Sequence, residues 1–191
     1  MIDVNRGVTY DETYTGIYET APNVCGNTGL YSSDPNGESF GFWDVTNHTP
    51  LTEPYFYPVP PDDFGYFLIY DMRSEEMLLL DEKLQCVSNL TEKWPELSEV
   101  RLSENRMTGD VDGSGKITIL DALGNLISHT DYDNIGWFSG GVAFCVKDGL
   151  YGYVDSNGNE VVPPKYIYAS NTQNGVGFLE NDNGIYLFTM T

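Results

Sequence analysis

Short runs in which apolar and polar residues alternate recur along the chain and predict β-strands. The clearest alternating pairs are Tyr151 with Tyr153, Ile117 with Ile119, and Phe40 with Phe42. A period of two over a short run is typical of a half-buried strand. Tight-turn sequences separate these runs, at residues 34–37, Asp112-Gly113, Asp148-Gly149 and Asn183-Gly184. One short helix is expected at residues 90–97, limited by Pro95.

The pattern repeats at a spacing of 34 residues. Seven identities share that spacing, namely Asp121, Gly124, Asn125, Tyr132, Gly141, Val142 and Phe144, which recur as Asp155, Gly158, Asn159, Tyr166, Gly175, Val176 and Phe178. Repeats of this length indicate small units, each of which cannot bury its apolar face alone. We therefore expect the tyrosines of the register, Tyr55, Tyr132 and Tyr166, to be equivalent and largely buried.

Weaker copies extend the repeat upstream and downstream. The anchor aspartates Asp44, Asp81, Asp121 and Asp155 are spaced by 37, 40 and 34 residues, and a half-unit at residues 184–188 follows residues 149–153 at 35. We predict an all-β array of about four to five antiparallel β-hairpin units, barrel-like or propeller-like, with a period of about 34–40 residues. The array would span residues 29–191, after an N-terminal cap or partial unit at residues 1–28. Residues 92–110 would form an inserted loop.

The unit at residues 149–166 resembles the bacterial WG-repeat family. That family combines an aromatic–Gly pair, an apolar–Asp pair, a turn Gly, an apolar pair with Pro, and Lys-Tyr. Here the sequence is Gly-Leu-Tyr-Gly-Tyr-Val-Asp-Ser-Asn-Gly-Asn-Glu-Val-Val-Pro-Pro-Lys-Tyr, with Tyr151 in place of the Trp. The unit at Lys116 is less similar, and those at Gly41 and Leu78 are degenerate. The resemblance covers roughly residue 29 to the C-terminus. It implies an all-β array with an interaction role and no catalytic residues.

The charge balance argues against nucleic acid as a partner. The chain has 29 acidic and 9 basic residues, a net charge of −20. Neutralisation of phosphates requires clustered Lys and Arg, which this composition does not offer. It also disfavours anionic membrane surfaces. Acids spread along the chain are typical of a solvated surface that keeps an extended array soluble.

The cysteines and the apolar runs give little information about the cellular location of the protein. Cys25, Cys86 and Cys145 stand about 60 residues apart, so no disulfide framework is expected, and Cys145 reads as a small core residue. The apolar runs are too short to span a bilayer, and no secretory signal is visible at the N-terminus. A location at the cell surface or outside the cell is slightly favoured over the cytoplasm.

Residues 110–121 resemble the calcium loop of dockerins and EF-hands. Asp110, Asp112, Ser114, Thr118 and Asp121 place oxygens at loop positions 1, 3, 5, 9 and 12. Gly124-Asn125 is a poor start for the helix that would follow, no second loop is present, and Asp121 belongs to the repeat register. We therefore expect a hairpin turn and no cofactor, with a calcium-stabilised cell-surface domain as an alternative.

The groups needed for catalysis are not assembled in the sequence. His48 and His129 lack zinc-site spacing, and no nucleophile elbow of the Gly-x-Ser-x-Gly kind exists. Paired carboxylates such as Asp62-Asp63, or Asp131 with Asp133, would in principle suit glycoside hydrolysis, but neighbouring acids are expected in so acidic a chain. We therefore predict that the chain is not an enzyme.

The aromatic residues suggest a binding surface. Trp137 lies in a loop flanked by Gly136 and Gly140, so it is the tryptophan most expected to be exposed, whereas Trp43 reads as core. We predict a module for protein or peptide binding or scaffolding, in which Trp137 is the anchor and Asp131 and Asp133 favour a basic partner. An extracellular carbohydrate-binding module that uses Trp137 and nearby tyrosines is the alternative.

Overall fold

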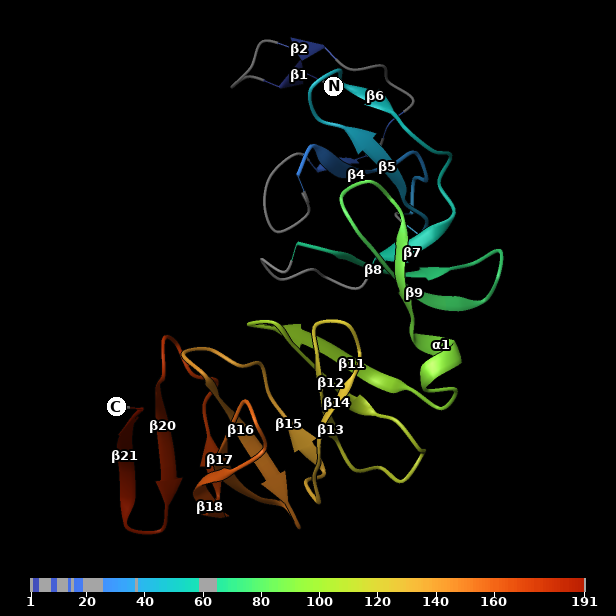
Figure 1. The fold of residues 1–191 in the computed structure, drawn as a ribbon. Helices are drawn as coiled ribbons and strands as arrows, with labels where there is room; N and C mark the ends of the chain where they lie inside the picture. The colour runs from blue at the N-terminus through green and yellow to red at the C-terminus, as the bar shows by residue number, and fades with distance from the viewer. Residues whose placement is uncertain are drawn as a thin grey trace. The chain divides into compact units, whose positions relative to one another are not determined.

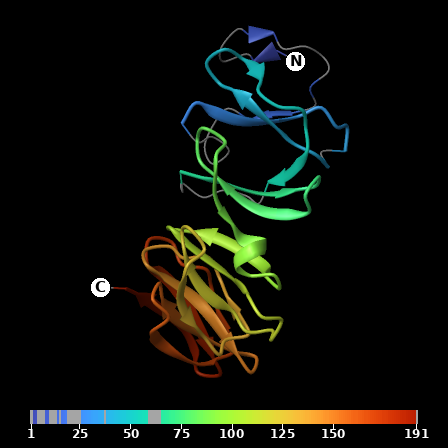
Figure 2. The ribbon, with the colours of Figure 1, turned by 45° about the vertical axis from the view of Figure 1, so that its right-hand side comes forward.

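The fold was analysed in a computed structural model that describes residues 2–3, 8–9, 14, 16–18, 26–36, 38–58 and 65–190. The described part is almost entirely β structure, and α1 (Leu90–Lys93) is its one helix. The chain divides into two compact units, Met1–Asn89 and Leu90–Thr191. Figure 1 shows short antiparallel strands throughout both units, and Figure 2 gives a second view of them.

The first unit contains two four-stranded antiparallel meanders and a small ribbon. Sheet I has the order β3 (Gly16–Tyr18), β4 (Thr28–Ser32), β5 (Gly41–Asp44) and β6 (Thr49–Pro50). Sheet II has the order β7 (Phe56–Pro58), β8 (Phe67–Asp71), β9 (Glu76–Leu80) and β10 (Cys86–Asn89). The ribbon pairs β1 (Ile2–Asp3) with β2 (Val8–Thr9). Sheets I and II share an aromatic core, in which the Phe42 and Phe56 rings stack with centroids 4.5 Å apart.

The second unit contains three sheets. Sheet III has the order β11 (Ser98–Ser103), β12 (Arg106–Asp110), β13 (Thr118–Asp121) and β14 (Leu126–His129). Sheet IV has the order β15 (Asn134–Ile135), β16 (Val142–Lys147), β17 (Leu150–Asp155) and β18 (Glu160–Tyr166). Sheet V has β19 (Tyr168–Ala169), β20 (Val176–Asn181) and β21 (Gly184–Thr189). Five antiparallel sheets of three or four strands confirm the predicted all-β repeat architecture.

The anchor aspartates hold the turn between the third and fourth strands of a sheet. Asp155 Oδ1 accepts hydrogen bonds from the backbone N–H groups of Asn157 (2.9 Å) and Asn159 (2.8 Å), and Oδ2 accepts one from Asn159 Nδ2 (2.8 Å). Asp121 accepts the same three bonds from Leu123 and Asn125. An aspartate that bonds the backbone ahead of it stabilises a turn. The strongest repeat signature is therefore a local turn device.

A left-handed residue occupies the third position after the anchor aspartate in sheets II, III and IV. Gly124 and Gly158 have φ values of 74° and 89°. Leu84 adopts the same region at 61° in the turn that Asp81 holds. Glycine adopts this conformation without steric cost, which explains why the two best-matching units share a Gly here. The unit at Asp81 accepts a strained residue instead, so its sequence looks degenerate although its geometry is retained.

The apolar alternation of sheet IV divides its side chains between two cores. One face of the sheet, with Ala143, Cys145 and Val154, packs on the sheet III residues Ile117 and Ile119. The opposite face, with Val142 and Tyr153, packs on Ala169 and Leu179 of sheet V. Cys145 is fully buried, as expected for a core thiol, and burial raises its pKa to about 12. Cys25 lies outside the described residues.

Strand pairing corrects the predicted register of the last half-unit. Phe144 pairs with Tyr153, and Phe178, which lies 34 residues after Phe144, pairs with Leu187. The structural spacing is therefore 34, and the value of 35 taken from the sequence is wrong by one residue. A slip of one residue moves every side chain of a strand to the other face. The structure thus equates Tyr153 with Leu187, and Gly152 with Tyr186.

Three other expectations need revision. Residues 92–110 are not an inserted loop, because they contain the second half of α1 and the hairpin of β11 with β12 that begins sheet III. The helix ends at Lys93, shorter than the predicted 90–97, since Pro95 cannot continue it. Among the register tyrosines only Tyr132 is fully buried, whereas Tyr55 and Tyr166 pack at the edges of their cores.

The predicted boundary at residue 28 stays untested, because most of residues 1–28 fall outside the described part. Sheet I includes β3, which precedes residue 29. No helix among the described residues is long and apolar enough to cross a membrane.

Candidate functional site

Trp137 projects from a loop whose neighbouring side chains are buried. The loop follows β15, and Ile135 and Phe138 on either side of the indole point into the core between sheets III and IV. Trp137 itself is 52% exposed. Gly136 has no room for a side chain, because an added Cβ would lie 2.4 Å from the Phe144 ring. The predicted exposure of Trp137 agrees with the structure, although its role in binding stays a prediction.

Sheet III fixes this loop from one side. The Phe138 N–H donates a buried hydrogen bond to Ser103 Oγ (2.7 Å). The two carboxylate oxygens of Glu104 accept hydrogen bonds from the N–H groups of Gly140 (2.6 Å) and Gly141 (2.8 Å). Both glycines have positive φ, at 69° and 77°, which aligns their N–H groups with the one carboxylate. A charged acceptor on two backbone donors makes a strong and directional anchor.

Residues 172–175, before β20, fix the loop from the other side. Ser139 Oγ accepts a hydrogen bond from the Asn174 N–H (2.9 Å), and the Ser139 carbonyl accepts bonds from the Gly175 N–H (2.8 Å) and Thr172 Oγ1 (3.0 Å). The Thr172 hydroxyl is also 2.8 Å from the Val142 carbonyl. The loop is therefore held by both neighbouring sheets, and the exposed indole is carried on an ordered backbone.

Arg101 is the described residue whose cation lies near Trp137. Its guanidinium carbon is 6.0 Å from the indole ring centroid, at the outer limit of a cation–π contact. Arg101 Nη1 is buried and lacks a hydrogen-bond partner among the described groups. Burial of an unpaired donor costs stability, and Nη1 itself is shielded from solvent. Trp137 and Arg101 together form a mixed aromatic and cationic patch.

Asp131 and Asp133 do not join this patch. They precede β15 and form ion pairs with Lys147 and Lys116, and Asp133 also accepts a hydrogen bond from the Asp148 N–H (2.8 Å). Bonds from these lysines lower the pKa of both carboxyls. Trp137 lies four residues beyond Asp133 across an extended strand, a separation on the order of 13 Å. Their part in binding a basic partner stays a prediction.

The oxygens of the calcium-like sequence are used in two separate turns. Asp110 accepts hydrogen bonds from the N–H groups of Asp112 (3.2 Å) and Gly115 (2.6 Å), and Asp112 accepts one from Ser114 (3.1 Å). Thr118 begins β13 and contacts His129 Nδ1 at 3.2 Å. Asp121 ends β13 and holds the next turn, so the strand separates it from Asp110. Position 12 is thus remote from position 1, unlike the single loop of an EF-hand.

The other candidate groups are also dispersed. Trp43 is buried as expected, and Trp94 donates its indole N–H to the Gly124 carbonyl (2.8 Å). Asp62 and Asp63 lie outside the described residues. Within the described part, no group of three or more His, Cys, Asp or Glu side chains is arranged to hold a metal ion.

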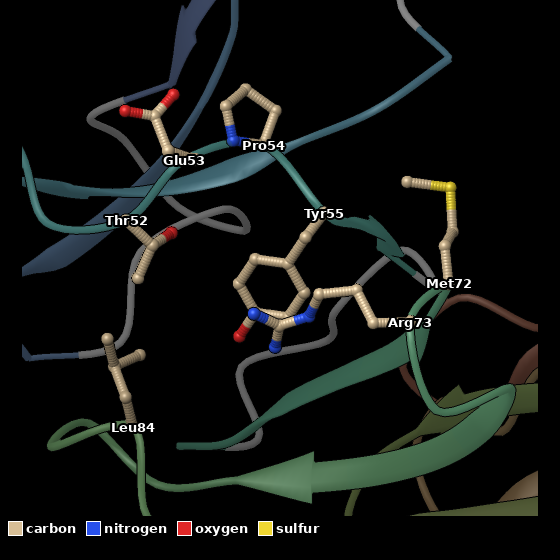
Figure 3. A pocket seen from close by; sticks show the side chains of 7 residues that line it. All are labelled: Thr52, Glu53, Pro54, Tyr55, Met72, Arg73 and Leu84. Carbon is tan, nitrogen blue, oxygen red and sulfur yellow. The ribbon is translucent and has the colours of Figure 1, made fainter.

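The first unit also contains a hollow of about 630 Å³ that was not predicted from the sequence. It is lined by Thr52, Glu53, Pro54, Tyr55, Met72, Arg73 and Leu84. Figure 3 shows the Arg73 guanidinium lying against the Tyr55 ring, 3.5 Å from its centroid. Arg73 also bonds both oxygens of Asp71, at 3.2 and 2.9 Å. The charge of Arg73 is therefore already matched by Asp71.

Comparison with solved structures supports the fold. Kluyveromyces lactis Hsv2 aligns with a TM-score of 0.51 at 12% identity, over 85% of this chain and 56% of its own. A second structure of that protein gives 0.50 at 13% identity, over 91% and 60%. A streptogramin B lyase gives only 0.45 at 12% identity, over all of this chain and 75% of its own. The chain spans 55–60% of the length of the Hsv2 structures, which have β-propeller-like folds.

Comparison with protein families identifies the repeat. No curated protein sequence matches the chain. The model of the WG containing repeat matches residues 117–151 and 151–184, which confirms the predicted resemblance for two units. The matched residues do not include the units anchored at Asp44 and Asp81. Residues 117–184 therefore match two WG containing repeats, in a chain whose described part is an all-β series of antiparallel sheets.

Proposed function

We propose that this chain is a non-enzymatic repeat module that binds a protein or peptide partner, with Trp137 at the centre of the contact. The observation that carries the proposal is an indole, 52% exposed, on a loop tied to both neighbouring sheets. A large side chain exposed on an ordered backbone loses little entropy when it binds, so most of its contact energy is retained as affinity. Ordered aromatic anchors of this kind dominate protein interfaces.

Arg101 supports a protein or peptide as the ligand. Tryptophan and arginine are the residues most enriched at interface hot spots. The Arg101 guanidinium, 6.0 Å from the indole centroid, would donate hydrogen bonds to a backbone carbonyl or carboxylate of a partner. A carbohydrate platform would instead favour a row of exposed rings. Of the three tryptophans, only Trp137 is exposed, and the cation near it is an arginine.

The net charge favours a partner that is basic overall. The chain carries −20, and this field steers cationic partners toward it at low ionic strength. Asp131 and Asp133 contribute to the field, but their ion pairs with lysines reduce their value as direct contacts. The negative charge of the whole surface therefore attracts the partner, and Trp137 makes the direct contact with it. Its association rate should fall as salt is added.

The test is a peptide selection followed by calorimetry. Peptides are selected from a displayed library on the wild-type protein, and their affinities are measured for wild type, Trp137→Ala and a control, Leu150→Ala. Leu150 is 40% exposed in the same unit and lies outside the Trp137 loop. We expect Trp137→Ala to melt as wild type does and to bind at least about 30-fold more weakly, or about 2 kcal/mol. The control should bind normally.

Two results would contradict the proposal. Equal affinity of Trp137→Ala and wild type would remove Trp137 from the binding surface. Loss of the cooperative melt in Trp137→Ala would show that the indole serves the fold.

A further inference from the structure

The open edge of sheet V differs from the other long edges in the described part of the molecule. Among the described strands, β21 pairs with β20 alone, and sheet V has three strands where the preceding sheets have four. Figure 1 shows β21 beside β20 at one end of the second unit. The remaining edge strands of six or more described residues are β11 and β18, and both carry charged residues and irregular pairing.

β21 lacks the features by which proteins protect an exposed edge. Its sequence, Gly-Ile-Tyr-Leu-Phe-Thr, has no charge and no proline, and it pairs with β20 in continuous register from Gly184 to Thr189. Charges, prolines and bulges are the usual means of preventing an edge from pairing with another chain. By contrast, β18 carries Glu160, Pro163, Pro164 and Lys165. The β21 edge is therefore competent for pairing.

The backbone groups at this edge can be assigned by alternation. Asn181 and Gly184 flank a two-residue turn and therefore bond to each other, and at the far end the Met190 N–H donates to the Gly175 carbonyl (2.9 Å). Even-numbered residues of β21 thus bond toward β20. Because donors alternate in an antiparallel strand, Ile185, Leu187 and Thr189 direct their N–H and C=O groups outward.

The side chains of the same odd-numbered residues are exposed. Ile185 and Leu187 are 69% and 66% exposed, and Phe178, which pairs with Leu187, is half exposed. The equivalent face of sheet IV is covered by sheet V. The residues of β21 with exposed apolar side chains are therefore the ones whose backbone groups point outward. One added strand would accept and donate hydrogen bonds at this edge and would also pack beside these side chains.

We propose that a second copy of this chain pairs with this edge, β21 against β21 in antiparallel orientation about a two-fold axis at Leu187. Two identical strands are self-complementary in this orientation. The two-fold axis makes every contact occur twice, so a residue i that faces j on the partner is matched by j facing i. Centring on Leu187 brings Ile185 opposite Thr189 and matches the outward groups of both copies. The two sheets V then form one continuous six-stranded sheet.

The two-fold axis also separates the charges nearest the edge. The acids of β20 and its turn to β21 are Glu180 and Asp182, and residues 184–191 have no charged side chain. Antiparallel pairing places the two turns that hold Asp182 at opposite ends of the joined strands, roughly 30 Å apart. That distance exceeds the Debye length of about 8 Å at physiological salt. The net charge of −20 still opposes association at long range, so added salt should strengthen the dimer.

The first experiment is sedimentation velocity from about 1 to about 200 µM, which brackets micromolar dissociation constants. We expect the wild type to dimerise with rising concentration, and more readily in high salt. Leu187→Lys should be monomeric throughout, because two ammonium groups would meet at the axis. The matched control is Leu126→Lys, whose position is also exposed and lies on the edge strand β14. This control should dimerise like the wild type.

The second experiment tests the register directly. Leu187→Cys and Leu126→Cys are each made with Cys25→Ser and Cys86→Ser, which leaves the buried Cys145 as the remaining native thiol. Paired residues at a two-fold axis have Cα atoms about 5.5 Å apart, within disulfide range. Mild oxidation should cross-link the Leu187→Cys protein into a dimer and leave the Leu126→Cys protein uncross-linked.

Three outcomes would overturn the proposal. A wild type that is monomeric at every concentration would exclude the dimer. A Leu187→Lys dimer as stable as the wild type would place the interface elsewhere. Equal cross-linking through both cysteine positions would show non-specific collision.

Discussion

Sheets IV and V have the same register, yet equivalent side chains have opposite environments. Tyr153 is fully buried, and its hydroxyl lies 3.1 Å from the Ser170 carbonyl and 3.0 Å from that of Phe178. Its equivalent in sheet V, Leu187, is 66% exposed. Both positions are apolar or aromatic, so the repeat keeps the same residue character on this face. Burial is decided by whether another sheet packs on that face.

The WG-type glycine shows the same contrast. Gly152 lies beneath β18, and a Cβ added there would lie 2.3 Å from the Val162 carbonyl oxygen. The equivalent position in sheet V is Tyr186, where no fourth strand is described. The glycine is therefore a consequence of the close approach of the fourth strand, and a large residue occurs where that strand is not present in the sheet.

Truncation of the buried tyrosine should produce the largest difference between the two sheets. Tyr153→Ala removes a fully buried aromatic side chain and should cost about 3–5 kcal/mol. The free energy of unfolding is measured by urea denaturation, with Trp94 and Trp137 as the reporters in this unit. Tyr153→Phe keeps the ring and serves as the control, with a loss of about 1 kcal/mol from the missing hydrogen bond. A cost under about 1 kcal/mol for Tyr153→Ala would contradict the packing of sheet V on sheet IV.

A side chain at Gly152 should be the next most damaging change. Gly152→Ala forces the added methyl group against the β18 backbone and should cost about 1–3 kcal/mol, as overpacking does. Tyr186→Ala, at the equivalent place in sheet V, should not produce such a clash. Urea denaturation of both variants gives the comparison. A neutral Gly152→Ala would mean that β18 can move away without loss.

The turn aspartates should make sheet IV sensitive to acid. Partial burial tends to raise the pKa of Asp155, but hydrogen bonds from the Asn159 side chain and from the backbone outweigh it, so the net pKa is lowered. A carboxyl group whose pKa is lowered by folding stabilises the fold fully at pH values above its unfolded pKa of about 3.9. This stabilisation is lost as the pH falls through the lower, folded pKa. Asp155→Asn should therefore reduce stability by about 1 kcal/mol at pH 7 and flatten the acid limb. Melting temperatures measured between about pH 2.5 and about pH 7, a range that includes the unfolded pKa, provide the measurement. An unchanged acid limb would assign the acid sensitivity to other groups.

Leu187→Ala should have the smallest effect on the monomer. A side chain that is two-thirds exposed contributes little burial, so the change should stay within about 0.5 kcal/mol. The measurement is made at low protein concentration, where self-association does not contribute. A cost above about 1.5 kcal/mol would show that Leu187 is covered within one chain, and it would remove the contrast with Tyr153.

The candidate site was only partly readable from the sequence. Flanking glycines indicated that Trp137 would be exposed, because glycines favour surface loops. Nothing in the local pattern indicated that Arg101 lies beside it, since Arg101 belongs to another sheet, 36 residues earlier. The sequence also suggested that Asp131 and Asp133 favour a basic partner, but it did not indicate their ion pairs with Lys147 and Lys116. Contacts between strands of different hairpins cannot be predicted from the local alternation of apolar and polar residues.

The sequence by itself determined the properties that depend on neighbours in the chain. Alternation specified the strands, and Asp121 and Asp155 with their following Gly and Asn residues specified the turns, because those hydrogen bonds span only four residues. Only the tertiary structure decided the register of β21, the burial of Tyr153 and the exposure of Leu187. These depend on which sheet packs next, and an apolar residue carries the same chemistry whether or not another sheet covers it.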